Sequence, residues 1–269
     1  MIVDCHVHGW GKESAEEIVR GMDAAGLDKI VLFTPPPRWD RGGEQLTMRQ
    51  AADWLAKIVA QAPERIIPFT WIEPTLPDAI EALEYAVGEL GFKGVKMIPN
   101  HWYPYDEAVF PVYEKIQELG VPILFHSGIL WGHADGSRFC RPAFYEALIH
   151  FPKVRFALAH IGWPWVDECL AVAGRFRAEA ERTGQPMQMW VDTCPGTPPV
   201  WRTEALQKAL AYLGDERLLW GSDTSGPSVA HAAQTLAGDR RILREVLGGN
   251  AETERRWMGE NALRFLGLA

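Results

Sequence analysis

Cysteines are few in this sequence, and their spacing shows no pairing. The 269 residues contain four of them, at Cys5, Cys140, Cys169 and Cys194. A disulfide framework or a cysteine-based zinc site needs closely and regularly spaced cysteines. We therefore expect free thiols in a reducing compartment.

Long apolar runs and an excess of positive charge are also missing. No uncharged apolar run approaches the ~18 residues that would span a bilayer, and the N-terminus lacks the basic-then-apolar pattern of a secretory signal. The formal net charge is −8 and the pI is about 5.5. General nucleic-acid binders usually carry a basic face. We therefore expect no nucleic-acid partner, no membrane partner and a cytoplasmic location.

Low-complexity segments and shifts in composition are absent as well, so we expect a single domain over residues 1–269. What the sequence does contain is an alternation of short apolar runs with helical patterns. The expected strands are Ile2–Val7, Lys29–Phe33, Ile66–Ile72, Phe92–Ile98, Val121–Phe125, Val154–Ala159, Gln188–Asp192 and Leu218–Gly221. The expected helices are Ser14–Ala25, Gln45–Gln61, Pro77–Glu89, Ala108–Leu119, Arg141–Phe151, Val166–Thr183, Trp201–Leu213, Ala230–Leu247 and Glu252–Leu266.

This alternation is typical of a parallel α/β sheet covered by helices. Eight strands in one chain of this length favour a closed (β/α)8 TIM barrel, which takes roughly 250 residues. A doubly wound open sheet is the alternative, but no glycine-rich phosphate fingerprint follows the first strand. In a barrel, the loops after the strands share one rim, and enzymes of this fold place their chemistry there.

The most informative motif, residues 4–8, ends the first expected strand with the sequence Asp-Cys-His-Val-His. Because side chains alternate along a strand, His6 and His8 should share a face with Asp4. The opposite face should hold Val3, Cys5 and Val7. Two adjacent imidazoles can bind one metal ion, since neutral histidine is the commonest metal ligand. The alternative is a strand that merely holds two polar residues, but adjacent buried imidazoles are costly without partners.

Alternation places further polar side chains at the ends of later strands. The residues expected to share a face are Gly94, Lys96 and Ile98 in the fourth strand, Leu124 and His126 in the fifth, Phe156, Leu158 and His160 in the sixth, and Leu219, Gly221 and Asp223 in the eighth. Singly these signals are weak, because a lone histidine is often structural and Asp223 could cap a turn. If the faces point inward, the set converges at the barrel mouth, and a His/carboxylate set with an open position suits a catalytic zinc ion.

Lys96 has several readings. It could hold an anionic substrate, or it could be carbamylated and bridge two metal ions. It could also be a structural lysine whose stem lies on apolar surface.

Aromatic side chains are unusually frequent near the expected rim, since the sequence has 12 tryptophans. The candidates for lining a pocket for a planar or aromatic ligand are Trp10, Trp71, Trp102, Trp131, Trp163 and Trp165. The alternative is that they pack the loops or form a subunit interface in a homo-oligomer. The arginines that could grip a substrate carboxylate, or could simply be solvated, are Arg38, Arg138 and Arg141.

Four further residues near strand ends have two readings each. His101 and His133 lie in rim loops and are either substrate contacts or ordinary loop residues. Glu73 and Asp192 end the third and seventh strands and could orient metal ligands or occupy turns.

With these motifs the chain resembles the amidohydrolase superfamily of metal-dependent barrels over nearly its whole length. The resemblance rests on residues 4–8, on Gly94–Met97, Phe125–Gly128, Ala159–Gly162 and Gly221–Asp223, and on the C-terminal segment Asn261–Leu268. It is strongest to the "amidohydrolase 2" branch, which includes aminocarboxymuconate-semialdehyde decarboxylase and related aromatic-acid decarboxylases and hydrolases. The set of motifs is specific for the superfamily but not for a substrate.

The resemblance implies a role for each strand-end residue. His6, His8, His126 and Asp223 match metal ligands, and Asp223 can also take a proton from metal-bound water. In the mononuclear form His160 would polarise the substrate or steer the water. In the binuclear form Lys96 would bridge, and His126 with His160 would hold the second ion. We favour one divalent ion and expect zinc, with manganese and iron as alternatives.

The resulting hypothesis is a metal-dependent hydrolase. It would activate water at the barrel mouth and cleave a C–N or C–O bond of a small amide, lactone or ester that is aromatic or carboxylated. The alternative is a lyase, a non-oxidative decarboxylase of an aromatic or dienoic acid, which the same metal ligands would serve. A third reading is a metal-dependent binding or scaffold protein, since fold does not fix function.

Overall fold

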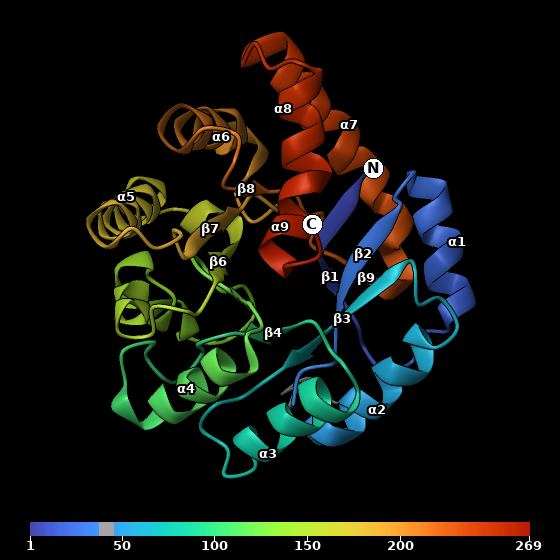
Figure 1. The fold of residues 1–269 in the computed structure, drawn as a ribbon. Helices are drawn as coiled ribbons and strands as arrows, with labels where there is room; N and C mark the ends of the chain where they lie inside the picture. Colours follow the sequence, from blue (N-terminus) through green and yellow to red (C-terminus); the bar gives the residue numbers. More distant parts are fainter. Residues whose placement is uncertain (38–45) are drawn as a thin grey trace.

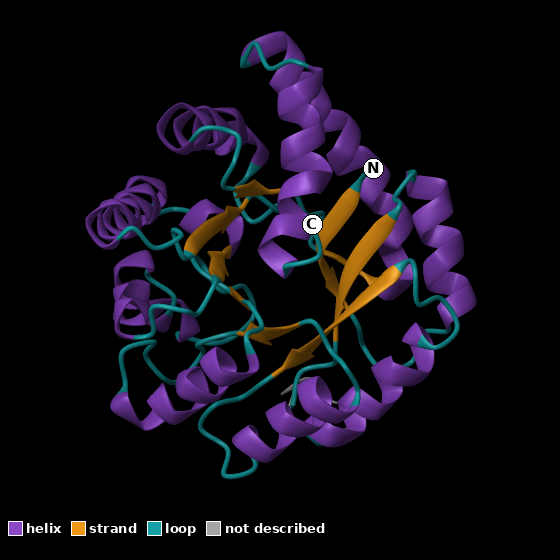
Figure 2. Cartoon of the chain, viewed as in Figure 1, coloured by secondary structure: helices purple, strands orange, loops and turns teal. Residues whose placement is uncertain are grey.

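The computed structural model describes residues 1–37 and 46–269. Their strands form one curved sheet surrounded by helices (Figures 1 and 2). The strands are β1 (Val3–His8), β2 (Lys29–Phe33), β3 (Ile66–Trp71), β4 (Gly94–Met97), β5 (Ile123–Phe125), β6 (Phe156–Leu158), β7 (Met189–Asp192), β8 (Leu218–Leu219) and β9 (Thr224–Ser225). Each of the eight expected strands is present, in most cases shortened at one or both ends.

The sheet is parallel throughout and closes on itself. Its order is β8-β7-β6-β5-β4-β3-β2-β1-β9. The short strands β8 and β9 lie one after the other beside β1: the Cys5 amide donates to the Trp220 carbonyl at 3.0 Å, and Val7 pairs with Thr224. The expected TIM barrel is therefore confirmed, and its last strand position is divided between two short segments.

The helices are α1 (Ala15–Ala25), α2 (Met48–Val59), α3 (Ala79–Glu84), α4 (Phe110–Leu119), α5 (Val166–Thr183), α6 (Pro199–Leu213), α7 (Ala232–Arg241), α8 (Ala251–Arg255) and α9 (Asn261–Leu266). Single π-helical turns follow three of them, at η1 (Tyr85–Glu89), η7 (Ile242–Val246) and η8 (Arg256–Glu260). The remaining short helices are of the 3₁₀ type, at η2 (Glu107–Val109), η3 (Gly136–Phe139), η4 (Pro142–His150), η5 (Ala159–Gly162) and η6 (Gly226–His231).

Capping residues in the sequence explain where α1 and α2 begin. Ser14 caps α1 through a capping box with Glu17, and Thr47 does the same for α2 with Gln50, so each satisfies free amides of the first turn. Gln45, the first residue of the expected second helix, lies outside the described residues. The expected helix Arg141–Phe151 is a 3₁₀ helix rather than an α-helix.

The core has two layers separated by the sheet. One lies between the sheet and the helices, and includes Ile30, Leu32, Phe125 and Val191. The other fills the barrel, where Val31, Phe33, Phe69, Leu124 and Trp190 alternate with the first set along their strands. Residues Ala262, Phe265 and Leu266 of α9 join this inner layer. In Figure 1 the helix lies over the end of the barrel near both termini, so the open end is the one where the strands finish.

Simple alternation fails in β1. Val3 and Cys5 pack in the inner layer, whereas Val7 packs in the outer one. The register of β1 against β2 shifts between Asp4 and Val7. The expectation that Val3, Cys5 and Val7 share a face is therefore wrong, because an irregularity in the strand changes its phase before the histidines.

Simple alternation also fails in β6. Phe156 and Leu158 pack in the outer layer, and Ala157 and Ala159 in the inner one. His160 still reaches the inside, because it adopts a left-handed conformation with φ 61° and ψ 19°. The expected shared face of His160 with Phe156 and Leu158 is therefore wrong, and a backbone turn directs the imidazole inward.

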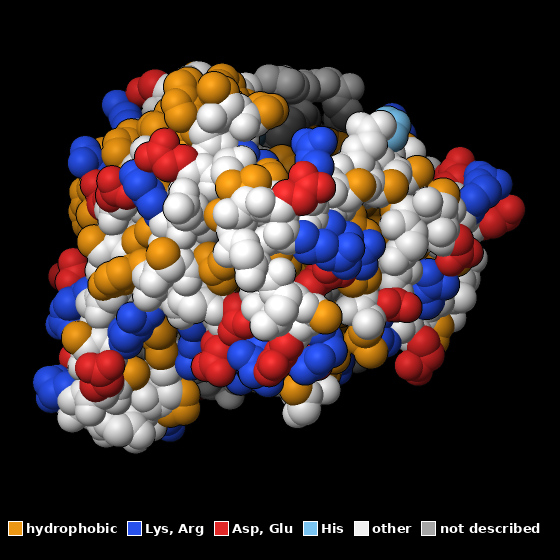
Figure 3. Space-filling model, turned by 90° about the horizontal axis from the view of Figure 1, so that it is seen from above, with side chains coloured by type: hydrophobic (Ala, Val, Ile, Leu, Met, Phe, Trp, Pro, Cys, Tyr) orange, Lys and Arg blue, Asp and Glu red, His pale blue; other side chains and the backbone are white. Residues whose placement is uncertain are grey.

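The surface carries charges of both signs. On the face shown in Figure 3, acidic and basic side chains lie intermingled. Within the described ranges, no helix combines the length and apolar character needed to cross a bilayer.

Candidate active site

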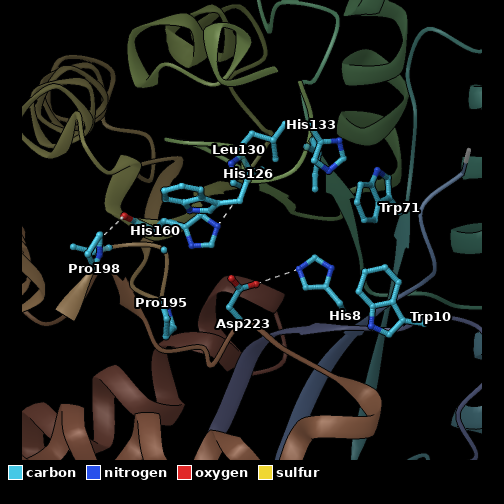
Figure 4. Close-up of a pocket in the computed structure, with 14 residues that line it drawn as sticks. His8, Trp10, Trp71, His126, Leu130, His133, His160, Pro195, Pro198 and Asp223 are labelled. Carbon is cyan, nitrogen blue, oxygen red and sulfur yellow. Dashed lines mark hydrogen bonds and ion pairs between the residues drawn. The ribbon is translucent and has the colours of Figure 1, made fainter. Parts of the chain in front are cut away.

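A cavity of about 520 Å³ opens where the strands finish (Figure 4). Its lining residues come from the loops after most strands: His8, Trp10, Trp71, Ile98, His126, Leu130, Trp131, His133, His160, Pro195, Gly196, Thr197, Pro198 and Asp223. Polar groups are few among them and consist chiefly of histidines and one carboxylate. Such a mainly apolar cavity with a few convergent polar groups is what a small-molecule site requires.

Three of the expected ligands meet at one point. His6 Nε2 lies 3.1 Å from His8 Nε2, and Asp223 Oδ1 lies 3.3 Å from each of these nitrogens. His6 is buried. His8 and Asp223 line the cavity, and Figure 4 shows their side chains pointing toward one another. Asp223 reaches this place through a left-handed backbone conformation with φ 55°.

The donor chemistry of this group fits a divalent metal ion. His6 Nδ1 lies 2.6 Å from Asp192 Oδ2 and therefore carries the ring proton, which leaves Nε2 with a lone pair. Ligand atoms about 2.0–2.2 Å from one ion stand roughly 3–3.6 Å apart. The separations of 3.1 and 3.3 Å among His6, His8 and Asp223 lie in that range.

Burial keeps His6 neutral and ready to bind a metal. Burial, and then the nearby Lys96 charge, hold the pKa of His6 well below its usual range. Burial alone would raise the pKa of Asp223, but its hydrogen bond with His8 and the charges of His160, His8 and Lys96 outweigh this and lower it. At neutral pH the site therefore presents neutral imidazole and an ionised carboxylate, the forms that bind metal.

Lys96 lies beneath the three-residue group. Its Nζ is fully buried, 3.3 Å from His6 Nε2 and 5.0 Å from the centre of the Phe33 ring. Burial lowers the pKa of Lys96 to about 8. Its side chain does not line the cavity, so its charge acts on the site from below.

His126 and His160 form a second pair at the same cavity. His126 Nδ1 lies 3.2 Å from His160 Nε2, and His126 Nε2 is buried without a hydrogen-bond partner. Tyr145 donates to the backbone carbonyl of His126 and fixes the strand end. His126 is not within the tight group of His6, His8 and Asp223. Its buried Nε2 carries either a lone pair or a proton, and a buried polar atom of either kind needs a partner.

Two residues of β7 and its loop support these histidines. Asp192, which the sequence offers as an orienting carboxylate, contacts His6 as described above. The sequence predicts Cys194 only as a free thiol, yet its Sγ lies 3.1 Å from His6 Nδ1 and 3.2 Å from His160 Nδ1. All four cysteines are free and buried. The signal for Cys194 in the sequence was only its position two residues after Asp192.

The predicted aromatic lining is only partly present. Trp10, Trp71 and Trp131 line the cavity. Trp102 is buried in the outer core, and Trp163 stacks on Trp201 with ring centres 5.5 Å apart, so neither is among the lining residues. Trp165 lies beside Trp163 in a separate surface hollow.

The predicted polar rim residues are mostly engaged elsewhere. Arg138 is exposed and pairs with Asp135 at 3.0 Å, and Arg141 pairs with Glu168 at 2.8 Å. Arg38 lies outside the described residues. Of the remaining candidates, His133 lines the cavity, whereas His101 and Glu73 contact Thr75 and lie 3.7 Å from each other.

Residues 3–268 match the family model described as Amidohydrolase. The chain belongs to this family. The resemblance to the amidohydrolase superfamily that the strand-end motifs indicate is confirmed. The protein is therefore an enzyme of this superfamily.

Three curated relatives of this amidohydrolase are lyases by name. A 2-keto-4-carboxy-3-hexenedioate hydratase of Sphingobium sp. is 25% identical over 64% of this chain, but the match spans only 56% of that protein. A 2-amino-3-carboxymuconate-6-semialdehyde decarboxylase of Dictyostelium discoideum is 21% identical, over 93% of this chain and 76% of the relative. A gamma-resorcylate decarboxylase of Polaromonas sp. is 25% identical, over 80% and 78%.

A solved structure shares the fold of this amidohydrolase. It is a dihydroxybenzoic acid decarboxylase from Polaromonas sp. with bound manganese and the inhibitor 2-nitroresorcinol. The TM-score is 0.70 at 18% identity, over 99% of this chain and 97% of that one. At such low identity the likeness supports the barrel alone.

Proposed function

We propose that this enzyme is a divalent-metal-dependent decarboxylase of a small aromatic or dienoic carboxylic acid. The observation that carries the proposal is the meeting of His6, His8 and Asp223 at one side of a cavity walled by tryptophans. The sequence alone favours hydrolysis with decarboxylation as the alternative. Two decarboxylases and a hydratase among the relatives favour the alternative instead.

We assign the metal to His6, His8 and Asp223, with the unpaired Nε2 of His126 as a further ligand. A bound divalent ion would supply Lewis-acid polarisation of a substrate oxygen and would orient the acid in the cavity. Histidine and carboxylate ligands suit both zinc and manganese. The manganese in the Polaromonas enzyme makes it the first metal to test beside zinc.

The walls of the cavity suit a planar substrate. Trp10 stacks against His8 with ring centres 6.5 Å apart and an interplanar angle of 24°, and Trp71 packs at 6.1 Å from His8 on another side. Flat rings on these walls would hold an aromatic or conjugated acid by stacking and would exclude water from it. Removal of water strengthens every charge interaction at the site.

Loss of carbon dioxide leaves an electron pair on carbon, which must take one proton. Asp223 and His160 both line the cavity and can deliver it. Burial lowers the pKa of His160, so this ring is neutral and serves as a hydrogen-bonding group. We assign the proton transfer to Asp223, which starts as a carboxylate, takes a proton from water or a substrate hydroxyl, and passes it to carbon.

The cavity offers the substrate carboxylate no arginine among its described lining residues. An arginine there would have favoured decarboxylation independently of the relatives. The nearest buried cation is Lys96, which adds positive charge beneath His6. The substrate carboxylate is therefore expected to be recognised by the metal and by the histidines rather than by a bidentate clamp.

The test is turnover of a panel by metal-loaded protein. Carboxylated phenols and dienoic acids, labelled with ¹³C at the carboxylate, should release labelled carbon dioxide and bicarbonate, seen by NMR, without water uptake. The chelated protein and the Asp223→Asn variant should not. Lactone or amide cleavage without carbon dioxide would support hydrolysis instead, and water addition to a double bond would support a hydratase. Metal binding by His6→Ala as tight as by the wild type would overturn the metal assignment.

A further inference from the structure

The thiol of Cys194 stands at a junction of three polar groups inside the barrel. Its Sγ lies 3.0 Å from Asp192 Oδ2, 3.1 Å from His6 Nδ1 and 3.2 Å from His160 Nδ1, and the residue is fully buried. The loop that carries it packs tightly on His160, because a Cβ atom at Gly196 would lie 2.4 Å from His160 Cγ. The segment after β7 is therefore shaped around this imidazole.

The distances around the thiol favour hydrogen bonds over a second metal ion. Nitrogen and sulfur ligands at about 2.0–2.3 Å from a tetrahedral zinc ion stand roughly 3.3–3.8 Å apart. The thiol lies closer than this to both ring nitrogens, at 3.1 Å from His6 Nδ1 and 3.2 Å from His160 Nδ1. Each pair must therefore share a proton, and the protons can be counted.

The count of shared protons starts at Asp192. Asp192 accepts only, because a carboxylate has no proton to give, and it takes the Nδ1 proton of His6. The thiol has one proton, which it can donate either to Asp192 Oδ2 or to His160 Nδ1. Donation to Asp192, where the acceptor is charged, is the stronger choice. Cys194 then presents only lone pairs to His160 Nδ1, which must carry its own proton.

The same count reaches His126. With a proton on Nδ1, a neutral His160 has a bare Nε2, which accepts from His126 Nδ1 at 3.2 Å. His126 then has a bare Nε2, the atom that is buried without a partner.

We propose that Cys194 is a positioning residue that sets the tautomers of His160 and His126, so that His126 directs a lone pair at the metal site. The opposite arrangement, with the thiol proton on His160, would place a proton on His126 Nε2 and prevent it from binding a metal. This role of Cys194 deepens the proposed function. It rests on the proposed function in one respect, that His126 is a metal ligand. The tautomers themselves exist in the metal-free protein.

The first measurement is the tautomer state of both rings in the metal-free wild type, from long-range ¹H–¹⁵N correlation spectra. We expect both rings to carry their proton on Nδ1. A protonated Nε2 on His126 would overturn the proposal whatever the variants do.

The second measurement compares Cys194→Ala with Cys194→Ser. The serine hydroxyl keeps one donor and one acceptor and should keep the wild-type tautomers, whereas alanine should give mixed tautomers and metal binding roughly 10–100-fold weaker, the usual effect of losing an orienting group. Cys169→Ala removes a buried thiol from α5 and should change neither quantity. Wild-type tautomers and metal affinity in Cys194→Ala would show that the backbone alone sets the rings, and would overturn the proposal.

These results separate the two levels of inference. Wild-type tautomers as expected, together with no decarboxylation of any acid tested, would leave the role of Cys194 intact and remove the proposed function. Decarboxylation by both wild type and Cys194→Ala, with unchanged tautomers, would support the proposed function and overturn the role of Cys194.

Discussion

The two ring nitrogens of His6 have different partners, and this difference decides which nitrogen can bind a metal. Nδ1 is held by the Asp192 carboxylate at 2.6 Å, whereas Nε2 faces His8 and Asp223. An imidazole that donates from one nitrogen to a carboxylate is a stronger and better oriented ligand through the other. Asp192 is not among the residues that line the active-site cavity, yet the proposed role of His6 as a metal ligand depends on it.

Substitution of Asp192 by asparagine tests this dependence. The amide lacks the charge that fixes the Nδ1 proton, so metal affinity should fall about 10–100-fold, as measured by competition with a chelating dye. Glu73→Gln changes the other buried strand-end carboxylate, which contacts Thr75 rather than a ligand histidine, and should bind metal like the wild type. Equal metal affinities in the two variants would show that Asp192 does not orient His6 for metal binding.

Lys96 makes the stability of the metal-free protein depend on alkaline pH. Burial lowers its pKa from 10.5 to about 8, so between these values the unfolded chain holds a proton that the folded chain has released. Stability rises with pH wherever the unfolded state binds more protons. The contribution of Lys96 should therefore increase from pH 8 to pH 10.5, by at most about 1.4 kcal/mol per pH unit.

Urea unfolding of the wild type and of Lys96→Met across this range measures the effect. Other groups titrate in the same range, so the informative quantity is the difference in unfolding free energy between the two proteins. That difference should shift in favour of the wild type as the pH rises. A difference that stays constant would mean that Lys96 keeps its ordinary pKa inside the barrel.

At the scale of elements, the sequence predicts the barrel well because each strand and helix is a local pattern. Alternation correctly places Lys96, Leu124 and Leu219 on the inside. It fails where the backbone departs from a regular strand: at the register shift in β1 and at the positive φ of His160. Neither irregularity has a residue signature, since no glycine stands at either place.

The candidate site was predictable to a similar extent and for the same reason. Short motifs at the ends of the first and eighth strands revealed His6, His8 and Asp223, and their joint placement at one barrel mouth pointed to metal chemistry. The role of Cys194 depends on contacts with His6 and His160, which lie 188 and 34 positions away. Likewise, the burial of Trp102 depends on packing between elements, which one sequence does not display.

The packing of β4 against β3 gives a test at the element scale. A Cβ atom at Gly94 would lie 2.2–2.6 Å from atoms of the Phe69 ring, so Gly94→Ala should overpack the barrel and destabilise the protein by about 1–3 kcal/mol. Gly88→Ala adds the same methyl group in the helical turn η1, where nothing lies within 4 Å, and should be neutral or stabilising by up to about 1 kcal/mol. Urea unfolding that ranks the two variants equally would show that Phe69 can move aside.

On the scale of the whole molecule, a buried ion pair connects the helical layer with the seam of the barrel. Arg202 of α6 donates to Asp239 of α7 at 2.7 and 2.6 Å, and the Trp220 indole, next to β8, donates to the same carboxylate at 3.0 Å. Asp239 is 1% exposed. The three groups join two helices to the strand position where the sheet closes, so this pair bears on closure of the barrel.

Removal of the cation should therefore be costly. Arg202→Met leaves the buried Asp239 carboxylate with the Trp220 indole as its one remaining side-chain partner among the described residues. Breaking a buried pair in this way costs about 3–5 kcal/mol. Lys208→Met on the same helix removes a cation whose pairs with Asp167 and Glu204 are exposed, which should cost about 1 kcal/mol or less. Urea unfolding at pH 7 measures both variants. Because Arg202 does not line the active-site cavity and donates to Asp239 instead, metal affinity measured below the unfolding transition should be the same in both. Similar stabilities for the two variants would mean that water or a rearranged side chain compensates Asp239, and that the seam closes without the ion pair.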